Sequence, residues 1–225
     1  MSLVRSNVAR IGLVAALSLL ASPLLVFFQY DFTVCTGITL DRPYTPRDTR
    51  QLRGDGRIRL VPLDAFPTST LDALASYYKT TYGLDVELAS PLTLPPDVHD
   101  PRRKQLVSNL VIKTLQMTHP QPPSERLIVI GLVETDMYIQ GVAWRYALSY
   151  RDGDRYAVVS TARLDRGCLG IAAVSHERMT SRVRKMVTKN IGVLYFGLPL
   201  SDDPRSVLYG QIGGSQELDR MSEDF

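Results

Sequence analysis

The chain has 225 residues, of which 44% are hydrophobic and 22% are charged, and its formal net charge is +3. After the N-terminal segment is set aside, this length fits one ordinary domain, and the absence of internal repeats excludes a repeat array. The small net charge gives no basis for a nucleic-acid partner, and we expect none.

The first residues predict membrane targeting. Arg5 and Arg10 precede Ile11 to Phe28, a run without a charged side chain. Its length lies at the short end of the roughly 17–25 residues that cross a bilayer. No small-x-small cleavage site follows Ser22, so we favour an uncleaved transmembrane helix, a signal anchor at residues 1–30, over a cleaved signal peptide. The positive-inside rule then predicts a single-pass protein with a cytoplasmic N-terminus and an extracytoplasmic domain.

Residues 31–56 are expected to form a linker that Pro43 and Pro46 keep extended. Cys35 lies in this linker, Cys168 lies in the domain that follows, and the chain has no other cysteine. In an oxidising compartment these two residues can form one disulfide. Two free thiols, or an intermolecular bridge through Cys35, are equally compatible with the sequence.

The domain, residues 57–225, begins with an alternating pattern that predicts a strand from Arg57 to Leu63. Thr68 or Ser69 is expected to cap a helix that runs to Tyr82 and is closed by Gly83. A short strand from Leu84 to Leu88 follows.

In the middle of the domain, Pro101 is expected to open a second helix. Its apolar face is made by leucine and isoleucine residues: Leu106, Leu110, Ile112 and Leu115. Prolines at positions 120, 122 and 123 mark the next boundary. Leu127 to Val133 is continuously apolar, which predicts a buried central strand.

Asp152-Gly153 predicts a tight hairpin between strands at Val142–Tyr150 and Arg155–Thr161, because both turn residues accept positive φ. Ser175 is expected to cap a long helix that reaches about Phe196, before a largely irregular tail. The predicted class is therefore α/β (α+β), with helices packed on a mixed sheet.

The spacing of the three histidines matches no metal-binding motif. His99, His119 and His176 lie in or beside predicted loops or helix starts, and we expect each to be a surface residue. His176-Glu177 begins like an H-E-x-x-H motif, but Thr180 stands where the second histidine belongs, which disfavours a zinc role.

Other candidate groups have ordinary structural interpretations. Ser160 and Ser175 lie in no nucleophile motif. Glu134 and Asp136 form a carboxylate pair on a loop after a buried strand, where such residues more often cap or turn.

Residues Val187 to Gly210 read VTKNIGVLYFGLPLSDDPRSVLYG. This stretch resembles the zinc helix and Met-turn of the archaemetzincins, whose motif is H-E-x-x-H-x-x-G-x-x-H-C followed by a C-x-M turn. The positions of the three histidines, the glutamate and the cysteine hold other residues here: Lys189, Val193, Pro199, Asn190 and Leu200. Gly192 lies within the matching stretch, Gly197 is one place late, and Ser206-Val207-Leu208 replaces the C-x-M turn.

The resemblance covers roughly Arg57 to Phe225 and extends to LIVIGLVETDMY and AVVSTARL. It implies a metzincin-like mixed twisted sheet packed with helices, a metallopeptidase-like fold, but no catalytic, cofactor-binding or metal-binding residue. The buried stripe of the helix would be made by Val187, Ile191, Leu194 and Leu198, so we expect Lys189 on its solvent face. The alternative is a polar pair of Lys189 and Asn190 in the cleft, with the lysine ammonium where the positive charge of the metal would stand.

The aromatic residues Trp144, Tyr146, Tyr150 and Tyr156 are expected to serve ordinary sheet packing. In metzincins a strand at the edge of the cleft pairs with substrate, so the alternative is a protein or peptide partner at the Trp144/Tyr146 hairpin.

Three functions follow from this resemblance. The first is a non-catalytic pseudoenzyme, a membrane-anchored pseudopeptidase that binds protein or peptide and needs no cofactor. The second is a zinc-dependent metallopeptidase with unconventional ligands, or another hydrolase. The third is a structural envelope protein.

Overall fold

The computed structural model of the chain describes residues 45, 49–166 and 173–225. The predicted anchor at residues 1–30, most of the linker, and both Cys35 and Cys168 lie outside the described residues. Within the described part, no helix is long and apolar enough to cross a membrane.

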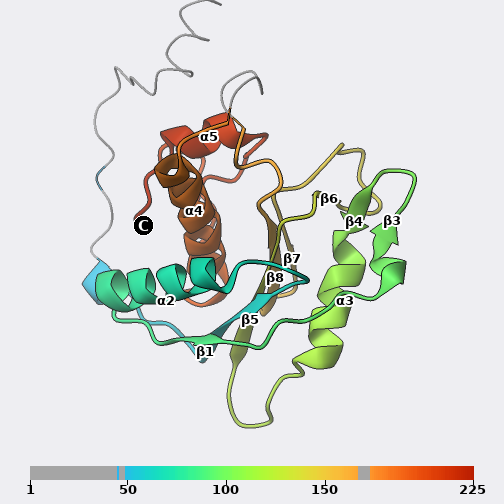
Figure 1. The fold of residues 1–225 in the computed structure, drawn as a ribbon. Coiled ribbons are helices and arrows are strands. Elements are labelled where there is room, and N and C mark those ends of the chain that lie inside the picture. Colours follow the sequence, from blue (N-terminus) through green and yellow to red (C-terminus); the bar gives the residue numbers. More distant parts are fainter. Residues whose placement is uncertain (1–44, 46–48, 167–172) are drawn as a thin grey trace, which may run out of the picture. The chain divides into compact units, whose positions relative to one another are not determined.

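A five-stranded sheet forms the centre of the domain (Figure 1). Its strands, in spatial order, are β2 (Val86–Leu88), β1 (Arg57–Pro62), β5 (Leu127–Val133), β8 (Tyr156–Ser160) and β7 (Ser149–Asp152). All neighbouring strands are parallel except β7, which pairs antiparallel with β8. The sheet is therefore mixed, as predicted, and β7 lies at one edge.

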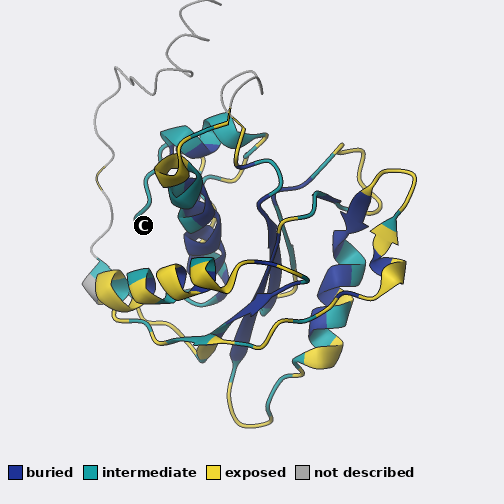
Figure 2. Cartoon of the chain, in the orientation of Figure 1, coloured by how far each residue is buried: buried dark blue, intermediate teal, exposed yellow. Residues whose placement is uncertain are grey.

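Helices cover both faces of this sheet (Figure 1). The helices are η1 (Thr49–Gln51), α2 (Thr68–Tyr82), η2 (Pro96–Val98), α3 (Ser108–Thr118), α4 (His176–Leu194) and α5 (Ser215–Arg220). Helices α2 and α4 pack on one face and α3 on the other. In β5, Ile128 and Ile130 face α2 and α4, whereas Leu127 and Val129 face α3. This alternation buries β5 completely, as its continuous apolar run predicts (Figure 2).

Several predicted elements are confirmed. Strands β1 and β5 have the predicted positions, and Gly83 ends α2 with φ of +68°. Gly153 makes the hairpin turn with φ of +66°. Ser175 caps α4 by accepting a hydrogen bond of 3.2 Å from the backbone N–H of Arg178.

The N-cap predicted for α2 was wrong. Pro67 precedes the helix, and neither Thr68 nor Ser69 caps it with a side-chain hydrogen bond. The tail is also less irregular than predicted, because it contains α5.

The second helix is present as α3, but its predicted start at Pro101 was wrong. Asp100 instead begins a tight turn, in which its carboxylate accepts the backbone N–H groups of Arg102 (2.9 Å) and Arg103 (3.2 Å). The turn joins two strands of a small second sheet, ordered β3 (His99–Asp100), β4 (Gln105–Val107) and β6 (Met137–Tyr138). Local side-chain bonding to the backbone thus overrides the helical pattern until Ser108.

The strand predicted over Val142–Tyr150 is shorter, since β7 begins only at Ser149. The backbone carbonyls of Trp144 and Arg145 accept hydrogen bonds from the Arg103 guanidinium rather than from a neighbouring strand. Residues 142–148 therefore form a loop. The Arg103 side chain holds its middle, and backbone bonds from Ala147 to Met137 and from Ser160 to Leu148 hold its end.

Candidate functional site

A cavity of about 910 Å³ lies between helix α4 and the edge strand β7. Met186 and Lys189 line it from α4, and Ser149 and Arg151 line it from β7. Ser149 and Arg151 reach the same cavity because alternate residues of a strand point to the same side. Two loops, over residues 143–147 and 210–213, complete the walls.

Lys189 is buried in this cavity, not exposed as predicted. Only 5% of the residue is accessible, and its Nζ donates a hydrogen bond to the backbone carbonyl of Tyr209. The prediction was wrong because α4 is covered on several sides: the sheet packs on one face and the segment after residue 200 on another. Burial, with a smaller contribution from the charge of Arg151, lowers the pKa of Lys189 to about 8.

Asn190 is completely buried, with its side-chain amide fully engaged. Its Nδ2 donates to the carbonyl of Met186 (2.8 Å) and to Ser149 Oγ (3.0 Å). Its Oδ1 accepts a hydrogen bond of 3.0 Å from Arg151 Nη1. Burial lowers the pKa of Arg151. Asn190 therefore fixes two side chains of β7 against α4 and offers no proton-accepting carboxylate.

The remaining positions of the degenerate motif carry no polar side chain that faces the cavity. Val193 is half-buried and packs on the core, and Pro199 is exposed. Gly197 has φ of +65° and follows the end of α4, where a left-handed residue commonly terminates a helix. Leu200 lines the cavity and is 48% exposed.

The turn in the Met-turn position packs directly under α4. Val207 and Leu208 are buried, and a Cβ added to Gly192 would lie 2.7 Å from Leu208 Cδ2. Ser206 Oγ accepts the backbone N–H of Leu208 at 3.2 Å. The skeleton of helix and turn is thus present without its signature side chains.

The residues at the motif positions do not fit a zinc site. Zinc at a catalytic centre takes three protein ligands, drawn from His, Cys, Asp and Glu. Across residues 49–166 and 173–225, no group of three such side chains lies close enough to hold a metal ion. His176 and Glu177 are exposed at the far N-terminal end of α4, and His99 is exposed on β3, as predicted for surface residues. His119 is half-buried, and burial lowers its pKa.

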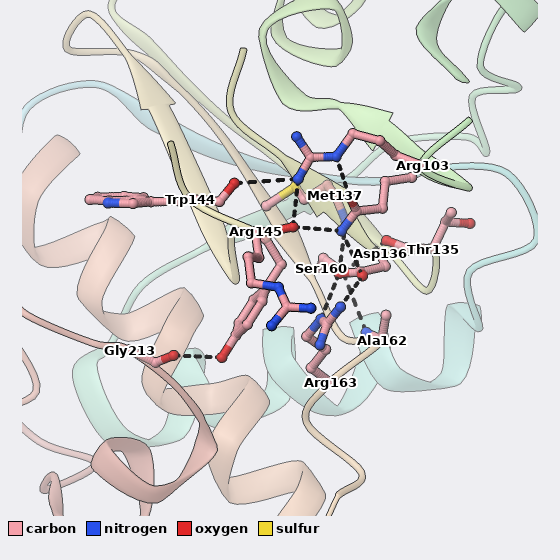
Figure 3. A network of polar contacts seen from close by, with 12 residues as sticks. Arg103, Thr135, Asp136, Met137, Trp144, Arg145, Ser160, Ala162, Arg163 and Gly213 are labelled. Atoms are coloured by element: carbon pink, nitrogen blue, oxygen red, sulfur yellow. Dashed lines mark hydrogen bonds and ion pairs between the residues drawn. The ribbon is translucent and has the colours of Figure 1, made fainter. Parts of the chain in front are cut away.

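The candidate carboxylate Asp136 serves structure (Figure 3). It accepts hydrogen bonds from Arg163 Nη2 (2.6 Å) and from Gln105 Nε2 (2.8 Å). Gln105 and Arg103 then donate to the carbonyl of Arg145. This network holds the 143–147 loop in place, in agreement with the turn-forming role predicted for Asp136. Glu134 is exposed.

The same network joins the two loops of the cavity (Figure 3). The Arg163 guanidinium lies 4.0 Å from the centre of the Tyr146 ring, and the Tyr146 hydroxyl donates a hydrogen bond of 2.6 Å to the carbonyl of Gly213. Ser160 is buried and donates to the carbonyl of Thr135, so it is not placed as a nucleophile. The two loops that form the cavity walls are therefore held to each other by non-covalent contacts.

The aromatic residues divide into two groups. Tyr156 is buried and donates to the carbonyl of His119 at 2.8 Å, so the predicted packing role is confirmed for it. Trp144 and Tyr146 belong to the loop that lines the cavity, and Trp144 is 64% exposed. Tyr150 both packs on the core and lines the cavity.

Arg151 was missed by sequence reasoning. The available signal was its spacing of two from Ser149 on an edge strand, but no pattern in the sequence shows which residue of α4 lies opposite.

No protein-family profile and no curated protein sequence matches this chain. Solved structures do. Archaemetzincin from Methanopyrus kandleri superimposes with a TM-score of 0.59 and 24% identity, over 81% of this chain and 92% of that one. Archaemetzincin from Archaeoglobus fulgidus, complexed with malonate, gives a TM-score of 0.60 and 20% identity over 75% and 94%. This chain has an archaemetzincin-like fold.

A third neighbour, a zinc-dependent peptidase from Methanocorpusculum labreanum, gives a TM-score of 0.61 and 20% identity, over 75% of this chain and 95% of that one. The archaemetzincin-like fold confirms the resemblance of sequence. At this level of identity the likeness concerns the fold, while chemistry must be judged from the residues in the cavity.

Proposed function

We propose that this chain is a membrane-anchored, extracytoplasmic pseudopeptidase that binds an extended peptide or protein segment without hydrolysing it. The observation that carries the proposal is the cavity between α4 and β7, which combines the position of a peptidase cleft with a non-ligating residue at every motif position. A protein partner, rather than a cofactor, is the expected occupant.

The absence of hydrolysis follows from the motif residues. Lys189, Val193 and Pro199 offer at most one nitrogen donor, and that amine is mainly protonated at neutral pH with a pKa of about 8. Without a metal, nothing lowers the pKa of an attacking water, and Asn190 cannot accept its proton.

Peptide binding is supported by the edge of the sheet. β7 is the last strand in the order and pairs only with β8 among the described strands. An extended peptide can therefore add to its free side through backbone hydrogen bonds, and alternate side chains would enter the neighbouring cavity. Leu200 and Trp144 supply exposed apolar surface beside that path.

Membrane anchoring rests on the sequence of residues 1–30. Moving Arg5 and Arg10 through the apolar core of a bilayer is costly, which favours a cytoplasmic N-terminus. A reporter enzyme that is active only outside the cytoplasm, fused after Phe225, should therefore be active. A cytoplasmic reporter, or a mature chain beginning after residue 22, contradicts the anchored topology.

A zinc-dependent metallopeptidase with unconventional ligands is the second candidate. It is favoured by one observation, the structural similarity to a protein described as a zinc-dependent peptidase. Under this alternative the ligands come from residues to which the geometry gives structural roles.

Binding is tested with the full chain and a panel of nineteen N-acetylated tetrapeptides that differ in their last residue, with tryptophan left out because it would itself fluoresce. Trp144 is the only tryptophan, so intrinsic fluorescence reports directly on the cavity. We expect saturable fluorescence changes with at least one peptide, and mass spectrometry should recover every peptide intact. Failure of all peptides to bind, or their cleavage, contradicts the proposal.

A matched pair of variants locates the binding surface. Leu200→Ala, in the cavity, should weaken peptide binding several-fold through lost apolar contact. Leu88→Ala should have no effect, because Leu88 is similarly exposed at 41% but lies on β2, at the opposite edge of the sheet. If Leu200→Ala and Leu88→Ala weaken peptide binding equally, the peptide does not bind in the cavity.

A further inference from the structure

We propose that Lys189 and Arg151 form a binding site for the C-terminal carboxylate of a peptide that lies along β7. This inference deepens the proposed function and rests on it. It names the chemical group that the cavity recognises and the two side chains that recognise it.

The first step is the convergence of two cations. Lys189 reaches the cavity from α4 and Arg151 reaches it from β7. Asn190, the residue after Lys189 in α4, accepts a hydrogen bond from Arg151 Nη1 and so holds β7 against this part of the helix. Two like charges thus face one cavity from opposite walls, and the charge of Arg151 disfavours the charged state of Lys189.

The second step is the lack of a balancing anion. No aspartate or glutamate lines the cavity, and neither Lys189 nor Arg151 forms an ion pair with any described residue. Other part-buried or buried arginines do have carboxylate partners: Arg163 pairs with Asp136, Arg182 with Asp219 and Arg184 with Glu223. Buried charges are normally paired, so the cavity is complementary to an anion from outside.

The third step is the nature of that anion. A guanidinium and an ammonium match the oxygens of a carboxylate, and a charge-assisted hydrogen bond in a desolvated site is strong. The walls around them include apolar and aromatic groups such as Met186, Tyr146 and Ile212, which suit the last side chain of a peptide. Because β7 offers a free edge to a peptide backbone, a chain terminus can bring its carboxylate to this point.

The site also predicts a dependence on pH. The titratable groups that line the cavity with Lys189 are Arg145, Tyr146, Tyr150 and Arg151. Burial raises the pKa of Tyr150, and arginine stays charged, so Lys189 is the group that changes charge near pH 8. Affinity for the carboxylate should therefore fall as the pH rises from 7 to 9.

The test uses the full chain and the same tetrapeptide panel, with each peptide as the free acid and as the C-terminal amide. We expect the free acids to bind at least tenfold more tightly than the amides in Trp144 fluorescence titrations. Lys189→Met should remove most of that difference. Asn190→Asp, which places a competing carboxylate beside Arg151, should do the same. Lys113→Met, an exposed lysine on α3, is the matched control and should retain it.

The outcomes separate this inference from the proposed function. Equal affinity for acid and amide, unchanged by Lys189→Met, overturns the carboxylate site while peptide binding stands. If the amidated peptide that ends in glutamate binds more tightly than free-acid peptides that end in non-acidic residues, the assignment to the chain terminus is overturned. If no peptide binds in either form, the proposed function itself fails.

Discussion

Two buried cations of helix α4, Arg182 and Lys189, are partnered in opposite ways. In the first half, the Arg182 guanidinium is 1% exposed and is completely paired. It donates to both carboxylate oxygens of Asp219 (2.8 and 2.7 Å) and to the carbonyls of Leu164 and Arg166 (2.7 Å each). In the second half, Lys189 donates a hydrogen bond to one backbone carbonyl, and the charge of Arg151 helps to lower its pKa.

This difference distinguishes support from recognition. Arg182 ties α4 to α5 and to the segment after β8 with a partner supplied by the chain itself. Lys189 and Arg151 donate to neutral oxygens, of Tyr209 and Asn190, and form no ion pair with a described carboxylate. An anionic ligand would therefore offset the part of their desolvation that these hydrogen bonds leave. Four substitutions in α4 and its contacts test this difference between the two cations.

The largest effect is expected from Asp219→Asn. It leaves the Arg182 charge buried without its counter-ion, which should lower the free energy of unfolding by about 3 kcal/mol. Urea denaturation followed by circular dichroism measures the change. Asp154→Asn is the control, because its carboxylate is 71% exposed in its pair with Arg126, and it should leave the midpoint nearly unchanged. Equal midpoints for the two variants would show that the Arg182 pair is not structural.

Gly192→Ala should cost about 2 kcal/mol of stability, because overpacking a filled core displaces its neighbours. The added Cβ would lie 2.4 Å from Cε1 of Phe225 and 2.7 Å from Leu208 Cδ2. Thermal or urea unfolding tests this. Gly213→Ala, where no heavy atom lies within 4 Å of the added Cβ, is the control. A neutral Gly192→Ala variant would contradict the close packing of α4 on the turn.

Lys189→Met should raise stability by about 1 kcal/mol at pH 7, since removal of a desolvated charge outweighs the lost hydrogen bond. The sign follows from a folded-state pKa of about 8 against an ordinary value of 10.5. The unfolded chain binds more protons between these values, so the wild type gains stability as the pH rises from 8 to 10.5. Urea unfolding at pH 7 and pH 10 should show the advantage of the variant shrinking. A destabilised variant at pH 7 would mean that Lys189 is supported like Arg182.

The smallest effect is expected from Asn190→Glu, which should leave the protein without peptidase activity. Restoring the general-base glutamate of the motif supplies no metal ligands, so no peptidase activity should appear. Incubation of the variant with the tetrapeptide panel and zinc, followed by mass spectrometry, measures it. Cleavage products would show that a metal-bound water is available at this position.

Much of the fold could be predicted from local pattern. The continuous apolar run of β5, the Gly83 end of α2, the Asp152-Gly153 turn and the Ser175 cap each depend on short-range physics. The failures come from side-chain hydrogen bonds, one set long-range and the other local. Side-chain bonds from Arg103 hold residues 144 and 145 in a loop, and the carboxylate of Asp100 replaces a helix start by a turn.

The site was only half predictable. The motif positions in α4 were found because their order along the chain matches a known pattern. The burial of Lys189 could not be predicted, because the segment after residue 200 covers a helix face whose sequence is polar. Arg151 enters the site only through the packing of β7 on α4, which no spacing within the chain encodes.

The zinc content of the full chain shows directly whether a catalytic metal site is present. The chain is purified without chelator from zinc-supplemented cells, and zinc is measured by inductively coupled plasma mass spectrometry. The substituted motif predicts fewer than about one zinc per ten chains and no cleavage of the peptide panel. One zinc per chain, together with peptide cleavage that a chelator abolishes, would contradict the account and place the ligands among residues that are assigned structural roles.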